Sequence, residues 1–385
     1  MSVLITGATG FLGCRVLREL LAGGPGGSDE PVTVLGRGTP DELRTRVEAA
    51  VTWLDAPALP PGALGRVRYV RGDVTEPSLG LTADERARVT DGLTQLWHSA
   101  ALLNLDDEPV ALHRSNVLGT RHVLELADEA PDTVQFLYVS TAYVAGRRRT
   151  GHVLEDDLRE DEGFQTCYEE SKYTAERLVH AWSARTGRTA TVLRPSLLAT
   201  DRSVPKGLPG QPFGTLTRII DDGLRARAAQ DAAVAAFLRH GSRGGEALHF
   251  RVEADPEGSM NVVPAEYAAR AMVRAAAARA GAPGLRTLHV THPHNTTFDA
   301  AVAALEQRYR GLRLTVVPHV PDPTPLERLV ARHGTRLLAF STQRRTYDRT
   351  RLLQAVGDLP DPDPVGHAYL TRAFGVADTA ALTPV

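Results

Sequence analysis

The sequence is poor in cysteine, with only Cys14 and Cys167 among its 385 residues. Two thiols so far apart build no disulfide framework, which favours a reducing compartment. Long apolar runs are also missing, because no stretch approaches the roughly 20 residues that a membrane-spanning helix needs. The residues after Met1 run directly into the strand-like SVLITG, without a basic leader or a cleavage site. We therefore expect a cytoplasmic protein without a membrane span, whose cysteines are buried helix residues and not nucleophiles.

An excess of charge of one sign is absent as well. The formal net charge is −2, with 23% charged and 42% hydrophobic residues. A chain so nearly neutral lacks the basic field that binds nucleic acid, so we expect no nucleic-acid partner. The composition is that of a globular chain with one large or two ordinary domains.

Short β-branched runs alternate with longer helical patterns from residue 2 to about residue 200. The runs read VLIT, PVTVLG, RVRYVRG, LTQLWHS, VQFLYVS and TATVLRPS. This alternation predicts an α/β fold, a Rossmann-like doubly wound parallel sheet covered by helices. Beyond DRSVPKGLPGQPFG, helical patterns dominate. We predict a first domain over residues 1–200 and a smaller, mainly helical region over 201–385, with parts of 246–300 returning to the first domain.

A glycine-rich turn, TGATGFLG, joins the first strand to the first helix. Gly7 permits a tight turn, Gly10 lets the backbone approach a pyrophosphate, and Gly13 lets helix and strand pack closely. The N-terminus of the helix then faces the negative charge of the phosphates. Because the motif follows a strand and opens a helix, we predict a dinucleotide site here and not a plain glycine-rich turn.

Arginine stands where NAD-binding folds usually carry an acidic residue, at the end of the second strand. There the sequence reads VLGRGTPDELRTR, so Arg37 ends the strand and Arg46 follows on the next helix. Two guanidiniums are suited to clamp a 2′-phosphate, and we therefore predict NADPH as the cofactor. Residues 1–200 are then the NADP-binding domain and residues 201–385 the substrate-binding region. The competing interpretation is that both arginines only solvate a loop.

Asp73, at the end of the third strand, has two interpretations. In the segment RGDVTEP it is placed to accept a hydrogen bond from the adenine amino group, with Val74 packing against the ring. A helix N-cap role explains the aspartate almost equally well on local sequence.

Three side chains are candidates for the chemistry. Tyr168 and Lys172 are four residues apart in a helical pattern, so that phenol and ammonium share one helix face. The strand VQFLYVS is followed by Thr141, at the edge of the sheet where such folds bind their ligands. We predict that Thr141 and Tyr168 converge on one ligand.

In the order of its motifs the chain resembles an extended short-chain dehydrogenase/reductase. The motifs are TGATGFLG, Asp73, HSAALL, SNVLGT, VSTAYVAG, Tyr168-x-x-x-Lys172 and LRPS. Within that superfamily the chain is most similar to fatty acyl-CoA reductases of the male sterility type and to the thioester reductase domains of carboxylic acid reductases and of peptide or polyketide synthetases.

Four segments carry this closer similarity, namely LWHSAALLNLDD, VSTAYVAG, LRPSLLATDRSVPKGLPG and MNVVPAEYAARAMVRAA. They fall between residues 1 and 290. The last departs from the family's proline-x-aspartate, because Glu266 stands in place of the aspartate. This departure leaves the role of the position open.

The resemblance implies a role for each candidate. Tyr168 is the general acid, which protonates the carbonyl oxygen as hydride reaches the carbon. Lys172 and the oxidised nicotinamide lower the pKa of this phenol, and Lys172 also binds the nicotinamide ribose. Thr141 donates a hydrogen bond to the substrate carbonyl. Asn116 holds a water behind Lys172 or, in the competing interpretation, is a helix residue bonded to backbone.

The resemblance also implies the remaining contacts to the dinucleotide. They come from the glycine-rich turn, the end of the fourth strand and the LRPS segment beside the nicotinamide amide. These residues are Thr9, Phe11, Leu12, Ala100, Ala101, Pro195 and Ser196.

The activity that the resemblance implies is NADPH-dependent reduction of an acyl thioester, bound to coenzyme A or to a carrier protein. Hydride addition gives a hemithioacetal, which loses thiolate to leave an aldehyde, and a second hydride gives an alcohol. One alternative is an NAD(P)-dependent dehydrogenase or epimerase acting on a sugar nucleotide or a secondary alcohol. Another is a redox-sensing regulator that binds dinucleotide without turnover, although such a protein needs no Tyr–Lys pair.

Two clusters of polar residues are left outside this interpretation. His289, His292 and His294 lie close together in HVTHPHN, but no cysteine or second cluster completes a site, so we expect no metal. The run from Arg147 to Arg149 follows the predicted catalytic strand. It is a solvated loop or, alternatively, contacts the phosphate of a phosphopantetheine arm or an acidic carrier protein.

Overall fold

The computed structural model describes residues 2–24, 27, 29–103, 108–228, 234, 248–278, 284–324, 327–328 and 343–375. The whole NLDD segment at 104–107 lies outside these residues, and so does most of 229–247, which includes the end of a predicted helical stretch.

Seven parallel strands form one sheet, in the order β12-β7-β5-β4-β1-β2-β3. Chain order reverses between β1 and β4, which is the place where doubly wound sheets bind ligands. The predicted Rossmann-like α/β fold is therefore confirmed. The strands are β1 (Ser2–Thr6), β2 (Val32–Gly36), β3 (Val67–Arg71), β4 (Leu93–His98), β5 (Gln135–Val139), β7 (Ala190–Pro195) and β12 (Leu285–Val290).

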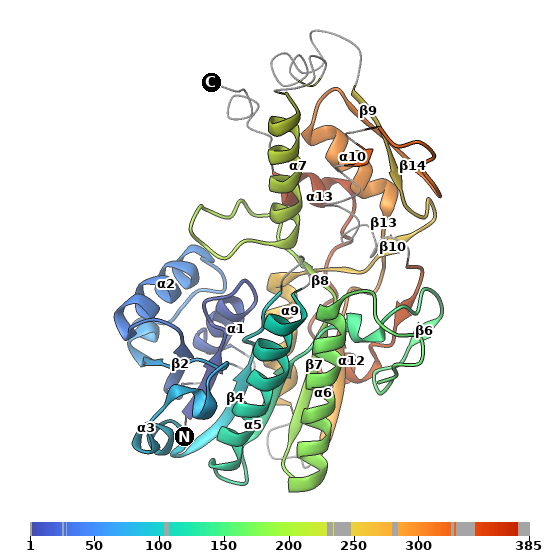
Figure 1. The fold of residues 1–385 in the computed structure, drawn as a ribbon. Coiled ribbons are helices and arrows are strands. Elements are labelled where there is room, and N and C mark those ends of the chain that lie inside the picture. The colour runs from blue at the N-terminus through green and yellow to red at the C-terminus, as the bar shows by residue number, and fades with distance from the viewer. Residues whose placement is uncertain are drawn as a thin grey trace.

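Helices cover both faces of the sheet and enclose two apolar cores (Figure 1). One face carries α1 (Gly13–Leu21), α2 (Pro40–Trp53), α9 (Ala265–Ala277) and α12 (Thr350–Val356). The other carries α3 (Ala83–Thr90), α5 (Gly119–Asp128) and α6 (Cys167–Thr186), with α5 and α6 side by side. Short helical turns are α4 (Pro109–Leu112), the π-helical η3 (His113–Leu118) and the 3₁₀ turns Ala63–Arg66, Pro77–Gly80 and Ala142–Ala145.

The long helix α6 has clear start and stop signals. The hydroxyl of Thr166 accepts a hydrogen bond from the backbone N–H of Glu169, which caps the N-terminus. At the other end Gly187 has φ of 70°, a left-handed conformation that glycine adopts at little cost. These signals place Tyr168 in the first turn of the helix and Lys172 in the second.

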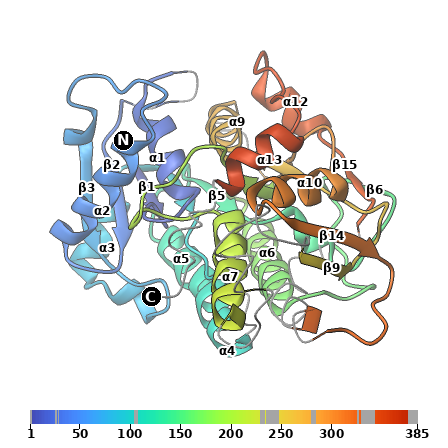
Figure 2. The same cartoon turned by 90° about the horizontal axis from the view of Figure 1, so that it is seen from above.

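A second group of elements lies beyond the carboxyl ends of the strands (Figures 1 and 2). It comprises the helices α7 (Pro212–Ala228), α10 (Phe298–Arg308) and α13 (His367–Phe374) and the paired strands β9 (Leu248–Glu253) and β14 (Leu312–Val317). Shorter strand pairs are β8 (Leu197–Ala199) with β11 (Val262–Pro264), β10 (Ser259–Met260) with β13 (Thr296–Thr297), and β6 (His152–Val153) with β15 (Thr346–Tyr347).

Segments late in the chain also complete the main sheet. β12 pairs with β7 at its edge, and α9 packs against α1. The division of the chain into cofactor and substrate domains stays a prediction. Among the residues that the structure describes, no helix has the length and apolar character needed to span a bilayer.

Candidate active site

The glycine-rich turn between β1 and α1 forms a tight backbone cradle. Gly7 has φ of 77°, and a Cβ atom there would lie 2.5 Å from the backbone nitrogen of Ala100. A Cβ atom on Gly13 would lie only 2.1 Å from the carbonyl oxygen of Gly7. Since both contacts are to backbone, no side-chain movement can relieve them. The turn therefore requires glycine, as an anion-binding loop at a helix N-terminus does.

Substitution of Gly13 by Ala should weaken dinucleotide binding at least tenfold, which corresponds to about 1.4 kcal/mol. The new methyl group must push α1 away from the turn, so the backbone N–H groups no longer point at the phosphates. Gly214→Ala is the control, because a Cβ atom there meets only the flexible side chain of Gln211 at 3.8 Å. Titration of cofactor fluorescence measures both. Equal binding by the Gly13 variant and the wild type would show that the glycine-rich turn does not bind the dinucleotide.

The candidate adenosine site lies at the ends of β2 and β3. Arg37 and Arg46 are both exposed, and neither forms a hydrogen bond or ion pair within the described part of the chain. Asp73 accepts two hydrogen bonds from Thr75 through one oxygen, from the backbone N–H and from the hydroxyl, both at 2.9 Å. It therefore stabilises a turn instead of capping an α-helix, and its second oxygen accepts no hydrogen bond from the described residues. Val74 is partly buried directly after it.

Helix α6 docks on the carboxyl end of β5. The ammonium of Lys172 donates to the carbonyl oxygen of Val139 at 2.8 Å and lies 4.3 Å from the ring centre of Tyr138. Thr141 follows the strand and caps the 3₁₀ turn Ala142–Ala145, accepting from the N–H of Tyr143 at 3.2 Å. Its hydroxyl also donates to the carbonyl of Pro195 at 3.4 Å. The structure thus brings Lys172 to the strand end, while convergence of Thr141 with the Tyr168 phenol stays a prediction.

The pKa values of this helix face differ from the expectation. Burial, with a smaller effect of Glu169, raises the pKa of Tyr168 to about 12. Burial lowers the pKa of Lys172 to about 7, against the opposing effect of Glu176. The expected lowering of the phenol pKa by Lys172 is therefore wrong for the protein groups alone, because burial and Glu169 both raise this pKa and Lys172 is not among the groups that shift it. A phenol with this pKa is fully protonated at neutral pH, as a proton donor must be.

Asn116 is bonded mainly to backbone. Its amide oxygen accepts from the N–H of Leu102 at 2.7 Å, and its amide nitrogen donates to the Leu102 carbonyl at 3.0 Å and to the Ser171 hydroxyl at 2.9 Å. Both amide hydrogens are thus used within the protein, which favours the backbone interpretation over a water-holding role. The residue lies in the π-helical segment η3, a local widening that is common at functional sites.

The remaining predicted cofactor residues lie around the same sheet edge. Ser196, directly after β7, has a buried hydroxyl oxygen without a hydrogen-bond partner among the described residues. Ala100 is partly buried, and its N–H donates to the Thr6 hydroxyl at 3.3 Å, whereas Ala101 is exposed. An unpartnered hydroxyl at one end and a backbone cradle at the other fit a dinucleotide laid across the sheet edge. Thr9 and Phe11 are partly buried in the cradle and Leu12 is buried.

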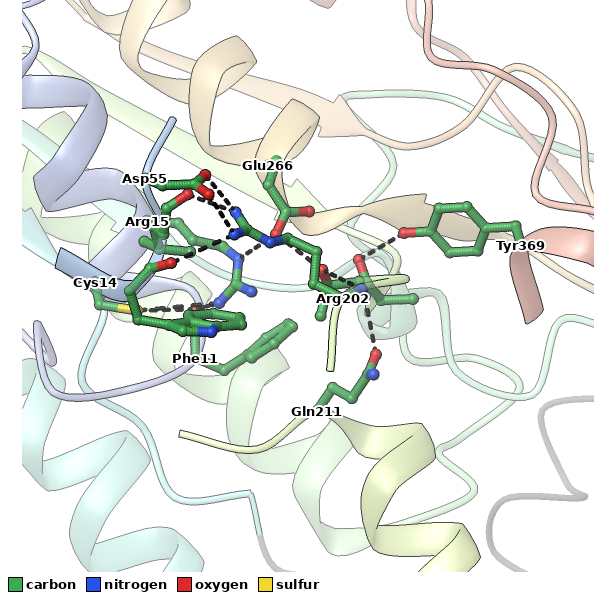
Figure 3. A network of polar contacts seen from close by, with 12 residues as sticks. Phe11, Cys14, Arg15, Asp55, Arg202, Gln211, Glu266 and Tyr369 are labelled. Carbon is green, nitrogen blue, oxygen red and sulfur yellow. Dashed lines mark hydrogen bonds and ion pairs between the residues drawn. The ribbon is translucent and has the colours of Figure 1, made fainter. Parts of the chain in front are cut away.

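A polar network that no sequence motif indicated joins α1 to the segment after β8 (Figure 3). Buried Arg15 donates to a carboxylate oxygen of Glu266 at 3.0 Å, and the hydroxyl of Thr200 donates to the same oxygen at 3.0 Å. The Arg15 guanidinium also stacks on the ring of Phe11, 4.0 Å from its centre. Glu266, which replaces the family aspartate, thus links the nucleotide cradle to the candidate substrate region.

The same segment is fastened to α2 through Arg202 (Figure 3). Its guanidinium donates to both carboxylate oxygens of Asp55, each at 3.0 Å, and lies 5.0 Å from the Trp53 ring centre. On the far side, the phenol of Tyr369 in α13 donates to the carbonyl of Ala199 at 3.1 Å. These contacts hold the segment between the two groups of elements.

Arg345, from the C-terminal part of the chain, fixes the turn that follows Thr141. Its guanidinium donates to the carbonyls of Gly146 at 2.7 Å and Arg148 at 2.8 Å and to the phenol oxygen of Tyr347 at 2.7 Å. The side chain is buried. Arg345 therefore clamps the turn after β5 from a segment about 200 residues away.

Substitution of Arg345 by Met should lower the free energy of unfolding by about 2 to 4 kcal/mol, because it leaves the buried carbonyl of Gly146 and the partly buried carbonyl of Arg148 without this donor. The neighbouring Arg344 is half exposed and pairs with Asp255 and Glu257 at the surface. Arg344→Met is therefore the matched control and should change stability little. Urea unfolding followed by circular dichroism compares the two variants. Equal urea midpoints for the two variants would show that Arg345 does not stabilise the turn after β5.

The other clusters take structural roles. Arg148 pairs with Asp157 at 2.7 Å, so this member of the arginine run is not free for a partner, while Arg147 and Arg149 are exposed. Nδ1 of His289 lies 3.0 Å from the carbonyl oxygen of Asp348, and the two ring nitrogens of His292 lie 2.8 Å and 3.1 Å from backbone carbonyl oxygens. Within the described ranges, no three His, Cys, Asp or Glu side chains form a group suited to a metal ion.

The two cysteines differ in environment. Cys14 is buried in α1, and burial raises the pKa of its thiol. Such a thiol is a poor nucleophile. Cys167 is partly exposed in the first turn of α6 and is thus less buried than expected.

The sequence profile of the family described as male sterility protein matches residues 5–272. A linear gramicidin synthase of Brevibacillus parabrevis is 25% identical over 316 residues, which cover 80% of this chain and 5% of that protein. The L-2-aminoadipate reductase large subunit of Penicillium chrysogenum is 28% identical over 348 residues, 86% of this chain and 22% of that protein. The chain thus spans only a small part of these curated relatives.

Solved structures agree on the fold. The terminal R domain from the myxalamid PKS-NRPS biosynthetic pathway superposes with a TM-score of 0.70 at 24% identity, covering 97% of this chain and 89% of that one. The matched profile includes the glycine-rich turn, Thr141, Tyr168 and Lys172, so the resemblance found in the sequence is confirmed. It supports a nicotinamide cofactor and oxidoreductase chemistry. The chain belongs to the male sterility protein family of NAD-binding proteins.

Proposed function

We propose that the protein is an NADPH-dependent reductase that converts an acyl thioester, held by a carrier protein or coenzyme A, into an aldehyde or alcohol. The observation that carries the proposal is the hydrogen bond from Lys172 of α6 to the carbonyl of Val139, at the end of β5 and two residues before Thr141, in a chain of this family. The names of the relatives add support, since one is an aminoadipate reductase and the other a linear gramicidin synthase.

In this proposal the cofactor is held along the sheet edge. The backbone of the turn from Gly7 to Gly13 would bind the pyrophosphate, Arg37 and Arg46 the 2′-phosphate, and Ser196 the nicotinamide end. When bound, NADPH supplies the hydride. The partnerless hydroxyl of Ser196 and the exposed guanidiniums support this assignment.

The protein residues orient the thioester and supply the proton. Thr141 donates a hydrogen bond to the carbonyl oxygen and fixes its angle to the cofactor. Tyr168 gives its proton to that oxygen as negative charge develops, and the pKa of about 12 keeps the phenol protonated until then. The Lys172 ammonium stabilises the phenolate that remains. Loss of thiolate then needs no covalent bond to the enzyme.

A hollow of about 480 Å³ opens beside the first turn of α6; this turn carries Tyr168, although Tyr168 is not among the residues that line the hollow. Arg147, Phe164 and Cys167 are among its lining residues, together with Glu160 and Glu170. Its position makes it our candidate for the passage through which an acyl-pantetheine chain approaches the phenol. The mixed charges of its rim do not favour one carrier over another.

The test of the proposed function is incubation with NADPH and a panel of acyl-coenzyme A and acyl-carrier thioesters, with products identified by mass spectrometry. We expect an aldehyde or an alcohol from at least one thioester. Conversion of a sugar nucleotide or a secondary alcohol with NAD, and of no thioester, would instead favour the dehydrogenase or epimerase alternative. Binding of NADPH without any turnover would favour a redox-sensing regulator.

A further inference from the structure

One face of α6 continues beyond the two predicted catalytic residues. Tyr168, Lys172 and Glu176 are spaced by four residues, so their side chains lie in one row on the helix. The row faces consecutive residues of the β5 end. Lys172 donates to the carbonyl of Val139 at 2.8 Å, and the hydroxyl of Ser140 donates to Glu176 at 2.6 Å.

Glu176 is a fully buried carboxylate with several donors. Arg194 of β7 donates to it through Nη2 at 2.6 Å and through Nε at 3.1 Å, in addition to the Ser140 hydroxyl. Nε2 of His180, one turn further along α6, lies 3.5 Å from the same carboxylate. Although burial opposes ionisation, Arg194 and the hydrogen bonds lower the pKa of Glu176 to about 2. The group is therefore negative at every pH at which the protein works.

Within the described ranges, the residues of β4, β5 and η3 that surround Lys172 carry no negative charge. The Tyr138 ring of β5 lies below the ammonium, and burial raises the pKa of that phenol well above its ordinary value. His98 of β4 is buried, and desolvation together with Lys172 lowers its pKa to about 3, so it is neutral. Asn116 of η3 contacts neutral Ser171 in the same helix turn. Glu176 is thus the negative group that acts on the lysine charge.

Arg194 is itself held in place from the far side. Its Nη1 lies 3.3 Å from the Nε2 of His289 in β12 and donates to the carbonyl of Glu155 at 3.4 Å. Burial lowers the pKa of His289 to about 3, so this ring is neutral and adds no charge. Neighbouring strands therefore fix the position of the Glu176 carboxylate.

We propose that Glu176 is a positioning residue that keeps the buried Lys172 ammonium charged and directed to the end of β5. The inference rests on the proposed function for its catalytic consequence, since Lys172 must be cationic to stabilise the Tyr168 phenolate. The physical basis is that a buried cation loses its hydration and needs a nearby negative charge to stay protonated. Ser140 and Arg194 supply the donors that keep this charge in place.

The chain allows the lysine charge to be measured directly, because Lys172 and Lys206 are its two lysines. Lysine labelled with ¹³C at Cε gives two NMR signals, and Lys206 is exposed and serves as an internal reference. The test variant is Glu176→Gln combined with Arg194→Met, since the double change removes the carboxylate without leaving an unpaired buried charge. Arg251→Met with Glu327→Gln removes a distant ion pair and is the matched control.

We expect the midpoint of the Lys172 titration to fall by about one pH unit or more in the test variant and to stay unchanged in the control. The alkaline limb of kcat/KM should move to lower pH by the same amount. Ser140→Ala leaves the Glu176–Arg194 ion pair intact and should lower the Lys172 midpoint by a smaller amount. If the double variant does not fold, this single variant tests the inference. A Lys172 midpoint that is the same in all variants would overturn the inference. The titration needs neither substrate nor turnover, so its result does not depend on whether the protein reduces thioesters.

Discussion

Replacement of Tyr168 by Phe is expected to lower kcat for thioester reduction by about a hundred- to ten-thousand-fold, the usual contribution of a positioned general acid. The change removes only the hydroxyl group and leaves the ring in its place in the first turn of α6. Without the phenolic proton, the oxygen of the reduced carbonyl gains negative charge with no donor beside it. Dissociation constants for NADPH should change much less, because the cradle lies on a different part of the sheet edge.

Tyr173→Phe is the matched control for this substitution. Tyr173 lies one turn further along the same helix, is buried and packs against the ring of Phe164 at 4.9 Å between centres. Its loss of a hydroxyl should leave kcat near the wild-type value. Steady-state rates and cofactor affinity are measured for both variants. If Tyr168→Phe turned over as fast as Tyr173→Phe, Tyr168 would not be the proton donor.

The second large effect is expected at the 2′-phosphate. Changing Arg37 and Arg46 together to Ser should reduce the preference for NADPH over NADH by roughly a hundredfold or more, since each lost charge-assisted hydrogen bond accounts for about 1.5 kcal/mol or more. The loss should appear in KM for NADPH, while KM for NADH stays nearly constant, because NADH carries no phosphate at this position.

Arg121→Ser is the control for the change in charge. Arg121 is an exposed residue of α5 that pairs with Glu125 on its own helix. The ratio of kcat/KM for the two cofactors is the measurement. Two results would contradict the prediction: a wild-type protein that does not prefer NADPH, or a double variant with the same ratio as the wild type. In either case Arg37 and Arg46 would be solvated loop residues that do not bind the 2′-phosphate.

The sequence patterns predicted the fold and the cradle well, because both depend on local rules. The alternation of strands and helices led to the parallel sheet, and glycine spacing led to contacts that exclude a Cβ atom at Gly7 and Gly13. The structure places Lys172 at the end of β5, the strand that precedes Thr141, whereas the convergence of Thr141 and Tyr168 stays a prediction.

Residues that act through distant partners were not predictable in this way. Glu266 was noticed only as a departure from a motif, and its bonds to Arg15 and Thr200 depend on how α9 packs against α1. Arg345 lies in a segment of the chain with no assigned role and reaches the turn after Thr141 only through tertiary packing. The predicted direction of the Tyr168 pKa shift was wrong for a similar reason. The sequence shows that a charged residue is near but not how far the phenol is buried.

The most direct test of NADPH-dependent thioester reduction is the ratio of free thiol released to NADPH oxidised, with an acyl-pantetheine thioester as substrate. We expect one thiol for each NADPH if reduction stops at the aldehyde and one thiol for every two NADPH if it continues to the alcohol. Both signals should be lost together in Tyr168→Phe. NADPH oxidation without thiol release would mean that the reduced group is not a thioester. Thiol release without NADPH oxidation would mean that the protein hydrolyses thioesters. Either result would contradict the proposed thioester reduction.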